Sequence, residues 1–463
     1  MESYPIIPLA TAILALTGGS VWFLFRKEIA NAEWFVENKW KLKSTLIWVP
    51  AAVASIFALP LLAKLQQTDN VYYNELQANG TYKFFEAFKS NELDYKTYYP
   101  TISEAEAEAF INKEYNSGQH NFHEVVSDKE EKHWNIVLVT LESMSAEYME
   151  RFGNDRHLTP FMDSLALHSM TFDNLFATGN RTVRGLEAVT LSLPPCPGQS
   201  IIKQAENQDM NSTSKILREK GYDAYYFYGG NSYFDNMSTF FGGNGYNILD
   251  HSSYKAGEKP FFAHIMSISN HRPFTSPEGK ISIPADSKSR AGGVMYSDYA
   301  LGEFIRQAQK EPWFSNTIFV ITADHCASSA GSTELPLHHY HIPAMIYAPG
   351  IIEPEVITKV ASQIYLMPTL FAIMGLNYDS YFYGKDVKAA DFRERAFVAT
   401  YQSLGYLEDN CLTIISPTRH HEQFDVNPNG NDPFELRLRT EVNQEMLDRT
   451  IAFYQTSTLW NKR

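Results

Sequence analysis

A single threonine stands between two arginines in the stretch 177–187, which reads Ala-Thr-Gly-Asn-Arg-Thr-Val-Arg-Gly-Leu-Glu. Threonine favours helix starts, because its hydroxyl can accept a hydrogen bond from an unpaired backbone N–H group, and the same unpaired groups attract anions. Thr182, flanked by Arg181 and Arg184, is therefore a candidate nucleophile that faces a phosphate or a sulfate. Taken alone, the stretch is more typical of a capping threonine beside two solvated arginines, so the assignment depends on its partners.

Two other stretches place acidic residues directly after an apolar run that is rich in β-branched residues. One run ends at Glu142, and the other ends at Asp324 and His325. Such runs are typical of parallel strands that are covered on both faces, and open α/β sheets bind ligands beyond the carboxyl ends of their strands. We therefore expect these residues to meet. Together with Thr182 they offer two carboxylates, an imidazole and a hydroxyl, which is a donor set for a divalent cation such as Zn²⁺ or Mn²⁺.

Five motifs, taken in order, resemble those of the lipoteichoic acid synthase-like phosphoglycerol transferases, within the alkaline phosphatase and sulfatase superfamily. They are Val-Thr-Leu-Glu-Ser-Met-Ser (139–145), Arg-Thr-Val-Arg-Gly-Leu-Glu-Ala (181–188), Phe-Asp-Asn-Met (234–237), Ser-Asn-His-Arg-Pro-Phe (269–274) and Thr-Ala-Asp-His (322–325). The resemblance covers most of residues 70–420, and the combination is far more specific than any one motif.

The resemblance implies a role for each matching residue. One divalent metal ion, Mn²⁺ in the first place with Zn²⁺ or Mg²⁺ as alternatives, would be bound by Glu142, Thr182, Asp324 and His325. The catalytic residues would be Thr182, as the covalent nucleophile, and His271, in contact with the phosphoryl group or in proton transfer. The substrate-binding residues would be Arg181, Arg184, Asp235, Asn236 and His271.

The implied substrates are a lipid donor and a saccharide acceptor. The donor would be phosphatidylglycerol or a related anionic lipid, and the acceptor a cell-envelope glycan or glycolipid. Gram-positive synthases carry histidine, tryptophan and arginine in the window where this chain has Tyr228, Asp235 and Met237. This departure argues against polymerisation of glycerol phosphate and favours a different acceptor.

The elements that must position these residues alternate between strands and helices. This alternation predicts an α/β fold with a mostly parallel sheet flanked by helices, and the resemblance implies that it is the fold of alkaline phosphatases and sulfatases. Strands are predicted at 136–140, 224–228, 261–268, 317–323, 344–347, 396–400 and 412–415. Helices are predicted from 159, and at 212–220, 294–309 and 440–459. Residues 134–463 are thus expected to form the catalytic domain, with late strands and a closing helix.

The segment before this domain predicts a membrane anchor. Residues 6–25 and 45–63 are uncharged, largely apolar runs of the length that spans a bilayer, so residues 1–64 would hold two transmembrane helices. The loop between them is rich in lysine and arginine, which places it in the cytoplasm. The catalytic domain would then lie on the extracytoplasmic (periplasmic) side of a bacterial inner membrane. Residues 65–133 are expected to form a helical stalk and linker, with a capping box at Ser103 and Glu106.

Composition excludes several classes of protein. The chain has 463 residues and a net charge of −14, which argues against nucleic acid as a partner, because nucleic-acid binding usually needs a basic face. An anionic lipid remains compatible, since a metal ion and local arginines can reverse the potential inside a cleft. Three scattered cysteines are too few for a disulfide framework or a cysteine zinc site.

Several alternatives share parts of this pattern. A sulfatase would need a modified cysteine or serine in a Cys-x-Pro-x-Arg or Ser-x-Pro-x-Arg setting, which the stretch 194–198 does not match. A phosphoethanolamine transferase fits the chemistry but tends to carry several disulfides. A phosphodiesterase that uses water as its acceptor stays open, whereas retention of all four presumptive ligands argues against a silent glycolipid-binding membrane protein. We interpret the cluster His338, His339 and His341 as a solvated or substrate-facing loop in preference to a second metal site.

Overall fold

The computed structural model describes residues 93–118, 121–230, 234–249, 259–327 and 335–459, with a few single positions and one short stretch before residue 55. The predicted membrane spans 6–25 and 45–63 fall almost entirely outside the described residues. No helix among the described residues is long and apolar enough to cross a membrane. The chain divides into two compact units, Met1–Phe85 and Glu86–Arg463, and the second unit contains every element discussed below.

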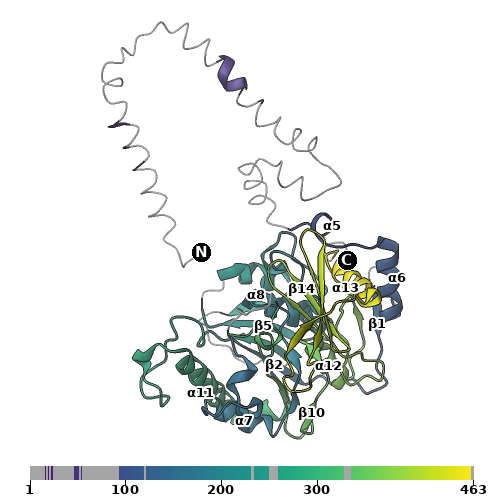
Figure 1. Ribbon diagram of the computed structural model, residues 1–463. Helices are drawn as coiled ribbons and strands as arrows, with labels where there is room; N and C mark the ends of the chain where they lie inside the picture. The colour runs from purple at the N-terminus through teal and green to yellow at the C-terminus, as the bar shows by residue number, and fades with distance from the viewer. Residues whose placement is uncertain are drawn as a thin grey trace. The chain divides into compact units, whose positions relative to one another are not determined.

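An eight-stranded sheet forms the centre of the second unit, with the strand order β10-β3-β9-β8-β2-β7-β5-β6 (Figure 1). Its strands are β2 (Asn135–Leu141), β3 (Met170–Phe172), β5 (Asp223–Tyr228), β6 (Asn247–Leu249), β7 (Phe261–Met266), β8 (Thr317–Ala323), β9 (Ala344–Tyr347) and β10 (Glu355–Ile357). Neighbouring strands run parallel except where β9 pairs with β3 and β8. The predicted α/β fold is confirmed, and the sheet is mixed.

The reversed direction of β9 follows from its connection to β8. A parallel partner requires a crossover segment, usually a helix. The described part of this connection, 324–327 and 335–343, contains only a short 3-10 turn, η8 (Leu337–His339). The chain therefore returns antiparallel. The sequence analysis predicted β9 as a strand but not its direction.

Helices cover the central strands, whose side chains are buried on both faces. All seven residues of β2 and all seven of β8 are buried, as expected for strands inside an α/β sheet. The covering helices are α7 (Pro160–Ala166), α8 (Thr182–Leu191), α9 (Thr213–Glu219), α10 (Met237–Gly243), α11 (Arg290–Ala308) and α12 (Leu366–Ile373). Two of them begin at the predicted signals: the Ser212 hydroxyl caps α9, and Pro160 opens α7.

Helices α7 and α11 lie side by side and are joined by a buried carboxylate (Figure 1). Asp298 on α11 accepts hydrogen bonds from the backbone N–H groups of Phe161, at 3.0 Å, and Met162, at 2.8 Å. These groups belong to the first turn of α7, whose N-cap residue, Thr159, gives no side-chain cap. Asp298 therefore supplies from another helix the acceptor that a helix start needs.

A second, antiparallel sheet follows in the chain and carries the closing helix. Its strands, in order, are β13 (Arg395–Ala399), β14 (Leu404–Glu408), β15 (Cys411–Ser416), β16 (His420–Val426) and β17 (Leu436–Leu438). Helix α13 (Gln444–Ser457) packs against β14 and β15. The structure thus contains the predicted strands at 396–400 and 412–415 and the predicted helix within 440–459. Two small two-stranded sheets pair β1 (His123–Val125) with β12 (Tyr378–Ser380) and β4 (Leu175–Phe176) with β11 (Ala361–Ser362).

The described part of the predicted stalk and linker packs on this domain. It contains α5 (Tyr95–Tyr98) and α6 (Glu104–Tyr115), and the capping box of Ser103 and Glu106 is present at the start of α6. Helix α6 packs along α13, where the rings of Phe110 and Phe453 lie 5.7 Å apart. A carboxylate oxygen of Glu114 on α6 lies 2.8 Å from the guanidinium of Arg395, which is buried at the start of β13.

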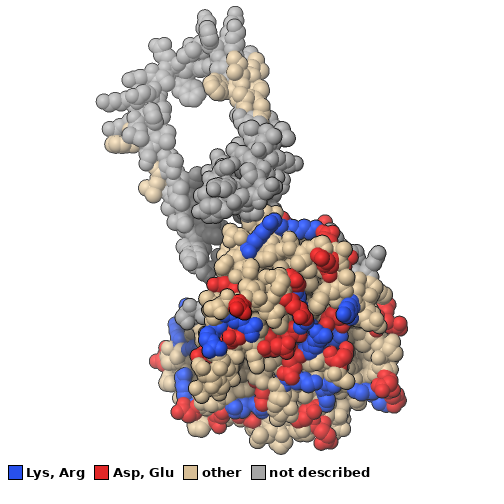
Figure 2. Space-filling model, turned by 45° about the vertical axis from the view of Figure 1, so that its right-hand side comes forward, with Lys and Arg blue, Asp and Glu red and all other residues tan. Residues whose placement is uncertain are grey.

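The surface of the second unit carries charges of both signs. Figure 2 shows lysine and arginine side chains interspersed with aspartate and glutamate over one face. The surface ion pairs of this unit include Lys388 with Glu355 and Arg437 with Asp425. Exposed pairs of this kind stabilise a fold by little, typically less than about 1 kcal/mol each.

Candidate metal centre

The carboxyl ends of β2 and β8 deliver two acidic residues to the same point of the sheet. In the register of this parallel pair Leu141 lies opposite Ala323, so Glu142 and Asp324 follow at the same edge. The backbone N–H of Asp324 donates to the carbonyl of Leu141 at 3.1 Å, which extends the ladder to the carboxylate itself. Glu142 is 4% exposed and Asp324 is fully buried. The predicted meeting of the two carboxylates is present in the structure.

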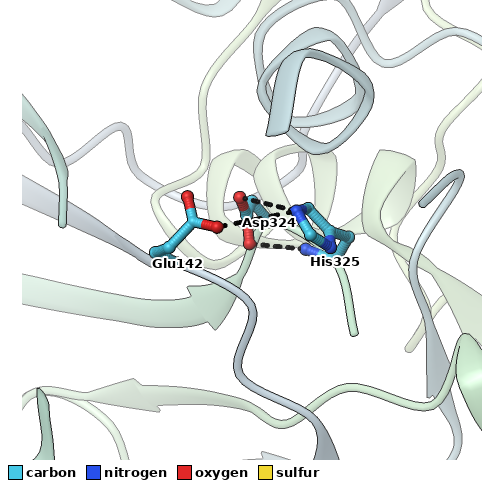
Figure 3. A group of neighbouring side chains, drawn as sticks. All are labelled: Glu142, Asp324 and His325. Atoms are coloured by element: carbon cyan, nitrogen blue, oxygen red, sulfur yellow. Dashed lines mark hydrogen bonds and ion pairs between the residues drawn. The ribbon is translucent and has the colours of Figure 1, made fainter. Parts of the chain in front are cut away.

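His325 completes a group of three possible metal ligands (Figure 3). Its Nε2 atom lies 3.8 Å from Glu142 Oε1 and 3.5 Å from Asp324 Oδ2. One donor atom from each of the three residues lies within 4.8 Å of the others. The His325 Nδ1 atom is 2.6 Å from the carbonyl oxygen of Cys326, so Nδ1 carries the proton and Nε2 presents its lone pair to the carboxylates.

Thr182 lies beside this group at the first residue of α8. Its hydroxyl donates to Glu142 Oε2 at 3.3 Å. The N-cap position belongs to Arg181, and no side chain caps this helix. The interpretation of Thr182 as a capping residue therefore does not describe the structure, in which the hydroxyl points to a carboxylate.

Two residues hold α8 against the end of β8. At Gly185 a Cβ atom would lie only 2.1 Å from the carbonyl oxygen of Asp324, so only glycine lets the helix approach this closely. The side chain of Gln363 donates to the carbonyl oxygens of Ala323, at 2.7 Å, and Asp324, at 2.9 Å, and accepts from the N–H of Thr178 at 3.0 Å. Sequence analysis missed both roles. Gly185 lies in a quoted motif, whereas nothing in the sequence marks Gln363.

The carboxylate of Asp324 is only half satisfied by the protein. Its Oδ1 atom accepts from the N–H groups of Ser143 and His325, both at 2.7 Å. Its buried Oδ2 atom has no hydrogen-bond partner. Burial and the neighbouring charge of Glu142 raise the pKa of Asp324 well above its usual value. A buried anion with an open oxygen is costly unless a cation pairs with it.

These donors fit a divalent cation. Two carboxylates, one imidazole nitrogen and one hydroxyl surround the same small volume, and an oxygen-rich set with one nitrogen suits Mn²⁺ or Mg²⁺ and also allows Zn²⁺. The unpartnered Oδ2 of Asp324 faces the imidazole of His325 at 3.5 Å, where a shared cation would satisfy both. Burial lowers the pKa of His325, Glu142 opposes that shift, and Arg181 and Arg290 add to it, which keeps the imidazole in the neutral form that binds metals.

The two arginines that flank Thr182 have different positions. Arg181 is exposed, and its charge lowers the pKa of His325, so it lies close to the group of three. Arg184 is 5% exposed and points into the protein. Its guanidinium pairs with Glu187 at 3.2 Å and donates to the carbonyl oxygens of Cys196 and Gly198, both at 2.6 Å. We infer a structural role for Arg184 in place of the substrate contact expected from sequence.

The structure does not place the remaining predicted substrate residues in contact with the group of three. His271 follows β7 on an exposed loop, where its Nδ1 atom lies 2.8 Å from the carbonyl oxygen of Arg272. Asp235 pairs with Lys203 at 2.6 Å, and the Asn236 side chain donates to the carbonyl oxygen of Ile202 at 2.7 Å. Both contacts are with the 3-10 turn η4 (Ile201–Lys203).

The histidine cluster after β8 forms no second group of ligands among the described residues. His341 lies 2.8 Å from the carbonyl oxygen of Asp173 and packs against Phe152, Phe176 and Phe434. Its role is therefore in packing.

Asn270 and Arg290 were missed by sequence analysis. The Asn270 side chain is fully buried and donates to the carbonyl oxygen of Ser143, at 2.9 Å, which fixes the turn behind Glu142. The Arg290 guanidinium donates to the carbonyl oxygens of Asn270, at 3.1 Å, and Ala327, at 3.4 Å. Asn270 lies within a quoted motif, whereas Arg290 begins a helix and gave no signal.

Comparison with known proteins agrees with this geometry. The family model described as Sulfatase matches residues 134–256 and 248–376, which together span more than half of the chain. Lipoteichoic acid synthase 2 of Bacillus subtilis is 23% identical over 312 residues, which cover 56% of this chain and 48% of that protein. Lipoteichoic acid synthase 1 of the same organism is 24% identical over 376 residues, covering 67% and 56%. The chain spans about half the length of the curated relatives it matches.

Solved structures share the fold over nearly their whole length. A protein of the alkaline phosphatase superfamily from Vibrio parahaemolyticus superposes with a TM-score of 0.74 at 28% identity, covering 80% of this chain and 98% of that one. The lipoteichoic acid synthase LtaP from Listeria monocytogenes gives a TM-score of 0.60 at 19% identity, covering 77% and 97%. The chain belongs to the sulfatase family of the alkaline phosphatase superfamily, and within it is lipoteichoic acid synthase-like.

Proposed function

We propose that this protein is a membrane-anchored, metal-dependent phosphoglycerol transferase. It would take the phosphoglycerol group from phosphatidylglycerol and pass it to a glycan or glycolipid of the cell envelope. The observation that carries the proposal is the contact between the Thr182 hydroxyl and Glu142, beside Asp324 and His325. Relatives named lipoteichoic acid synthases support the transferred group.

Four side chains, those of Glu142, Thr182, Asp324 and His325, would hold one divalent ion, Mn²⁺ in the first place. When bound, such an ion lowers the pKa of a hydroxyl and polarises a phosphoryl oxygen. The protein's own contribution is position. Glu142 Oε2 accepts a hydrogen bond from the Thr182 hydroxyl and so orients its oxygen, while Gly185 and Gln363 fix the distance between α8 and Asp324. Preorganised groups of this kind account for a large part of enzymatic rate enhancement.

The reaction would proceed in two displacements at phosphorus. In the first, the Thr182 Oγ1 atom bonds to phosphorus, the bond from phosphorus to the diacylglycerol oxygen breaks, and diacylglycerol leaves with one proton. In the second, an acceptor hydroxyl loses its proton and bonds to the same phosphorus, the bond from phosphorus to Thr182 Oγ1 breaks, and Thr182 regains a proton. Splitting one difficult transfer into two easier ones is the advantage of a covalent nucleophile.

His271 is the residue that we propose for proton transfer. Because its Nδ1 atom donates to the carbonyl oxygen of Arg272, the neutral ring presents Nε2 as a proton acceptor. Its exposure on the loop after β7 is compatible with an acceptor that arrives from solvent. Asp235 and Asn236 remain candidates for head-group contact, which would require Asp235 to exchange its pairing with Lys203.

The proposed location follows from the two apolar runs 6–25 and 45–63. They would anchor the chain in a bacterial inner membrane, with the catalytic domain on the periplasmic side. A lipid donor then needs no transport, because its head group already faces the domain. The second substrate would be an envelope saccharide in the same compartment.

The decisive experiment combines a labelled lipid with variants of Thr182. Purified protein with Mn²⁺ is incubated with phosphatidylglycerol labelled in the head group, and diacylglycerol release and label on the Thr182 peptide are measured. Thr182→Ser should retain measurable release, whereas Thr182→Ala should lose label and lower release by about 10³-fold or more. Release of free glycerol phosphate without an acceptor would identify a phosphodiesterase. Absence of both label and diacylglycerol in the wild type would overturn the proposed donor.

A further inference from the structure

Burial of Arg184 raises the question of which other cation meets the phosphoryl group. Phosphoryl transfer places charge on the non-bridging oxygens, which proteins stabilise with arginine or lysine. The guanidinium of Arg184 pairs with Glu187 and donates to two carbonyl oxygens. Arg181 is exposed beside the nucleophile and can serve one side of the group. A second guanidinium belongs to Arg290, the first residue of α11.

Arg290 is tied to both loops that carry the candidate ligands. It donates to the carbonyl oxygen of Ala327, two residues after His325, at 3.4 Å. It also donates to the carbonyl oxygen of Asn270, at 3.1 Å, and the side chain of Asn270 holds the carbonyl of Ser143, next to Glu142. The guanidinium therefore lies where the loops after β2, β7 and β8 come together.

The orientation of Arg290 is fixed before any ligand arrives. Its guanidinium lies 4.5 Å from the ring centroid of Phe274, which is half-buried on the loop after β7. Together with the two carbonyl contacts, this stacking fixes the plane of the guanidinium. An arginine held in this way loses little side-chain entropy when it binds an anion.

The charge of Arg290 has no carboxylate partner among the residues that the structure describes. The ion pairs found there join other residues, and the guanidinium has five N–H donors, of which the two carbonyl contacts use only part. The guanidinium also lies next to the candidate metal centre, because it contacts the carbonyl oxygen of Ala327, two residues after His325. A half-buried, oriented and unpaired guanidinium next to two carboxylates and an imidazole is suited to an anionic ligand.

We propose that Arg290 binds the non-bridging oxygens of the phosphodiester that enters the metal centre. The inference rests on the proposed function and assigns a positively charged contact to a residue outside the quoted motifs. The competing explanation is structural: Arg290 would only tie together the loops after β7 and β8. The two explanations differ in whether anion affinity or loop stability is lost when the guanidinium is removed.

The test measures binding of glycerol 1-phosphate to the Mn²⁺-loaded full-length protein by isothermal titration calorimetry. Arg290→Gln should weaken this binding by about 10-fold to 100-fold, the range for a lost charge-assisted hydrogen bond. Arg290→Lys should retain part of the affinity, since lysine keeps the charge but lacks the planar pair of N–H donors of the guanidinium. The matched control is Arg306→Gln on the same helix, whose arginine also stacks on a phenylalanine, at 5.7 Å from the Phe161 ring, but pairs with Glu303.

Mn²⁺ affinity and thermal melting of each variant separate the two explanations. The proposal is supported if Arg290→Gln binds glycerol phosphate more weakly while its Mn²⁺ affinity and melting temperature equal those of Arg306→Gln. It is overturned if glycerol phosphate binds both variants equally, if the wild type does not bind it, or if Mn²⁺ affinity falls by the same factor. Arg290-dependent binding without diacylglycerol release from phosphatidylglycerol would sustain this inference and reject the proposed donor.

Discussion

Replacing Gly185 by alanine perturbs the candidate site without removing a functional group. The added Cβ atom would lie 2.1 Å from the carbonyl oxygen of Asp324, and its neighbours there are backbone atoms, which cannot rotate away. Helix α8 must therefore retreat by about 1 Å to reach ordinary contact. Thr182 moves with it, because it lies in the first turn of the same helix.

The expected loss can be estimated from that displacement. A misplacement of about 1 Å in a reacting group typically lowers the rate by about 10²-fold. Overpacking of a close contact also destabilises a fold by about 1–3 kcal/mol. We therefore expect Gly185→Ala to fold with a lower melting temperature and to release diacylglycerol from phosphatidylglycerol about 10²-fold more slowly than the wild type.

The matched control is Gly242→Ala on α10, where the added Cβ would find one neighbour at an ordinary 3.9 Å. That variant should keep its rate and its stability. The assay is initial-rate release of diacylglycerol, with thermal melting of the same preparations. A Gly185→Ala protein that turns over as fast as the control would refute the claim that close approach of α8 sets the position of the nucleophile.

Two further predictions concern groups around the site and in the scaffold. Gln363→Leu removes both hydrogen bonds from this side chain to the end of β8. Because supporting contacts orient metal ligands, the variant should bind Mn²⁺ about 10-fold or more weakly, as measured by calorimetry. An unchanged Mn²⁺ affinity would contradict this prediction. Burial raises the pKa of Asp298 to about 6, so the folded state holds its proton more tightly than the unfolded chain does. The stability that this proton gives is present at low pH and is lost as the pH rises from about 4 to about 6. In urea unfolding, the wild type should therefore lose up to about 3 kcal/mol relative to Asp298→Asn over that interval, and a constant difference would show that folding does not raise the pKa of this carboxyl.

The central part of the fold was predictable because its signals are local. β2 and β8 appear in the sequence as short β-branched runs, since buried parallel strands exclude polar residues on both faces. Their carboxyl ends then placed Glu142 and Asp324 together by the rule that governs such sheets. The convergence with Thr182 followed from the motifs and is present as a hydrogen bond.

The parts that escaped prediction depend on contacts between distant segments. Arg181 and Arg184 are equivalent in the sequence, and only the packing of α8 decides that one is exposed and the other is buried on Glu187. Gln363 and Arg290 donate to main-chain carbonyl groups. Every residue has such a group, so the sequence does not show which residues accept these hydrogen bonds. The reversed direction of β9 likewise depends on how its connection runs, and not on the residues of the strand.

The packing of α6 on α13 has a consequence for anyone who wishes to prepare a soluble enzyme. The family match begins at residue 134, but a protein that starts there would lack Phe110, whose ring packs against Phe453 on α13. It would also leave the buried guanidinium of Arg395 without Glu114, and an orphaned buried charge costs about 3–5 kcal/mol. A shortened protein should therefore begin before α5, so that α6 and Glu114 are retained.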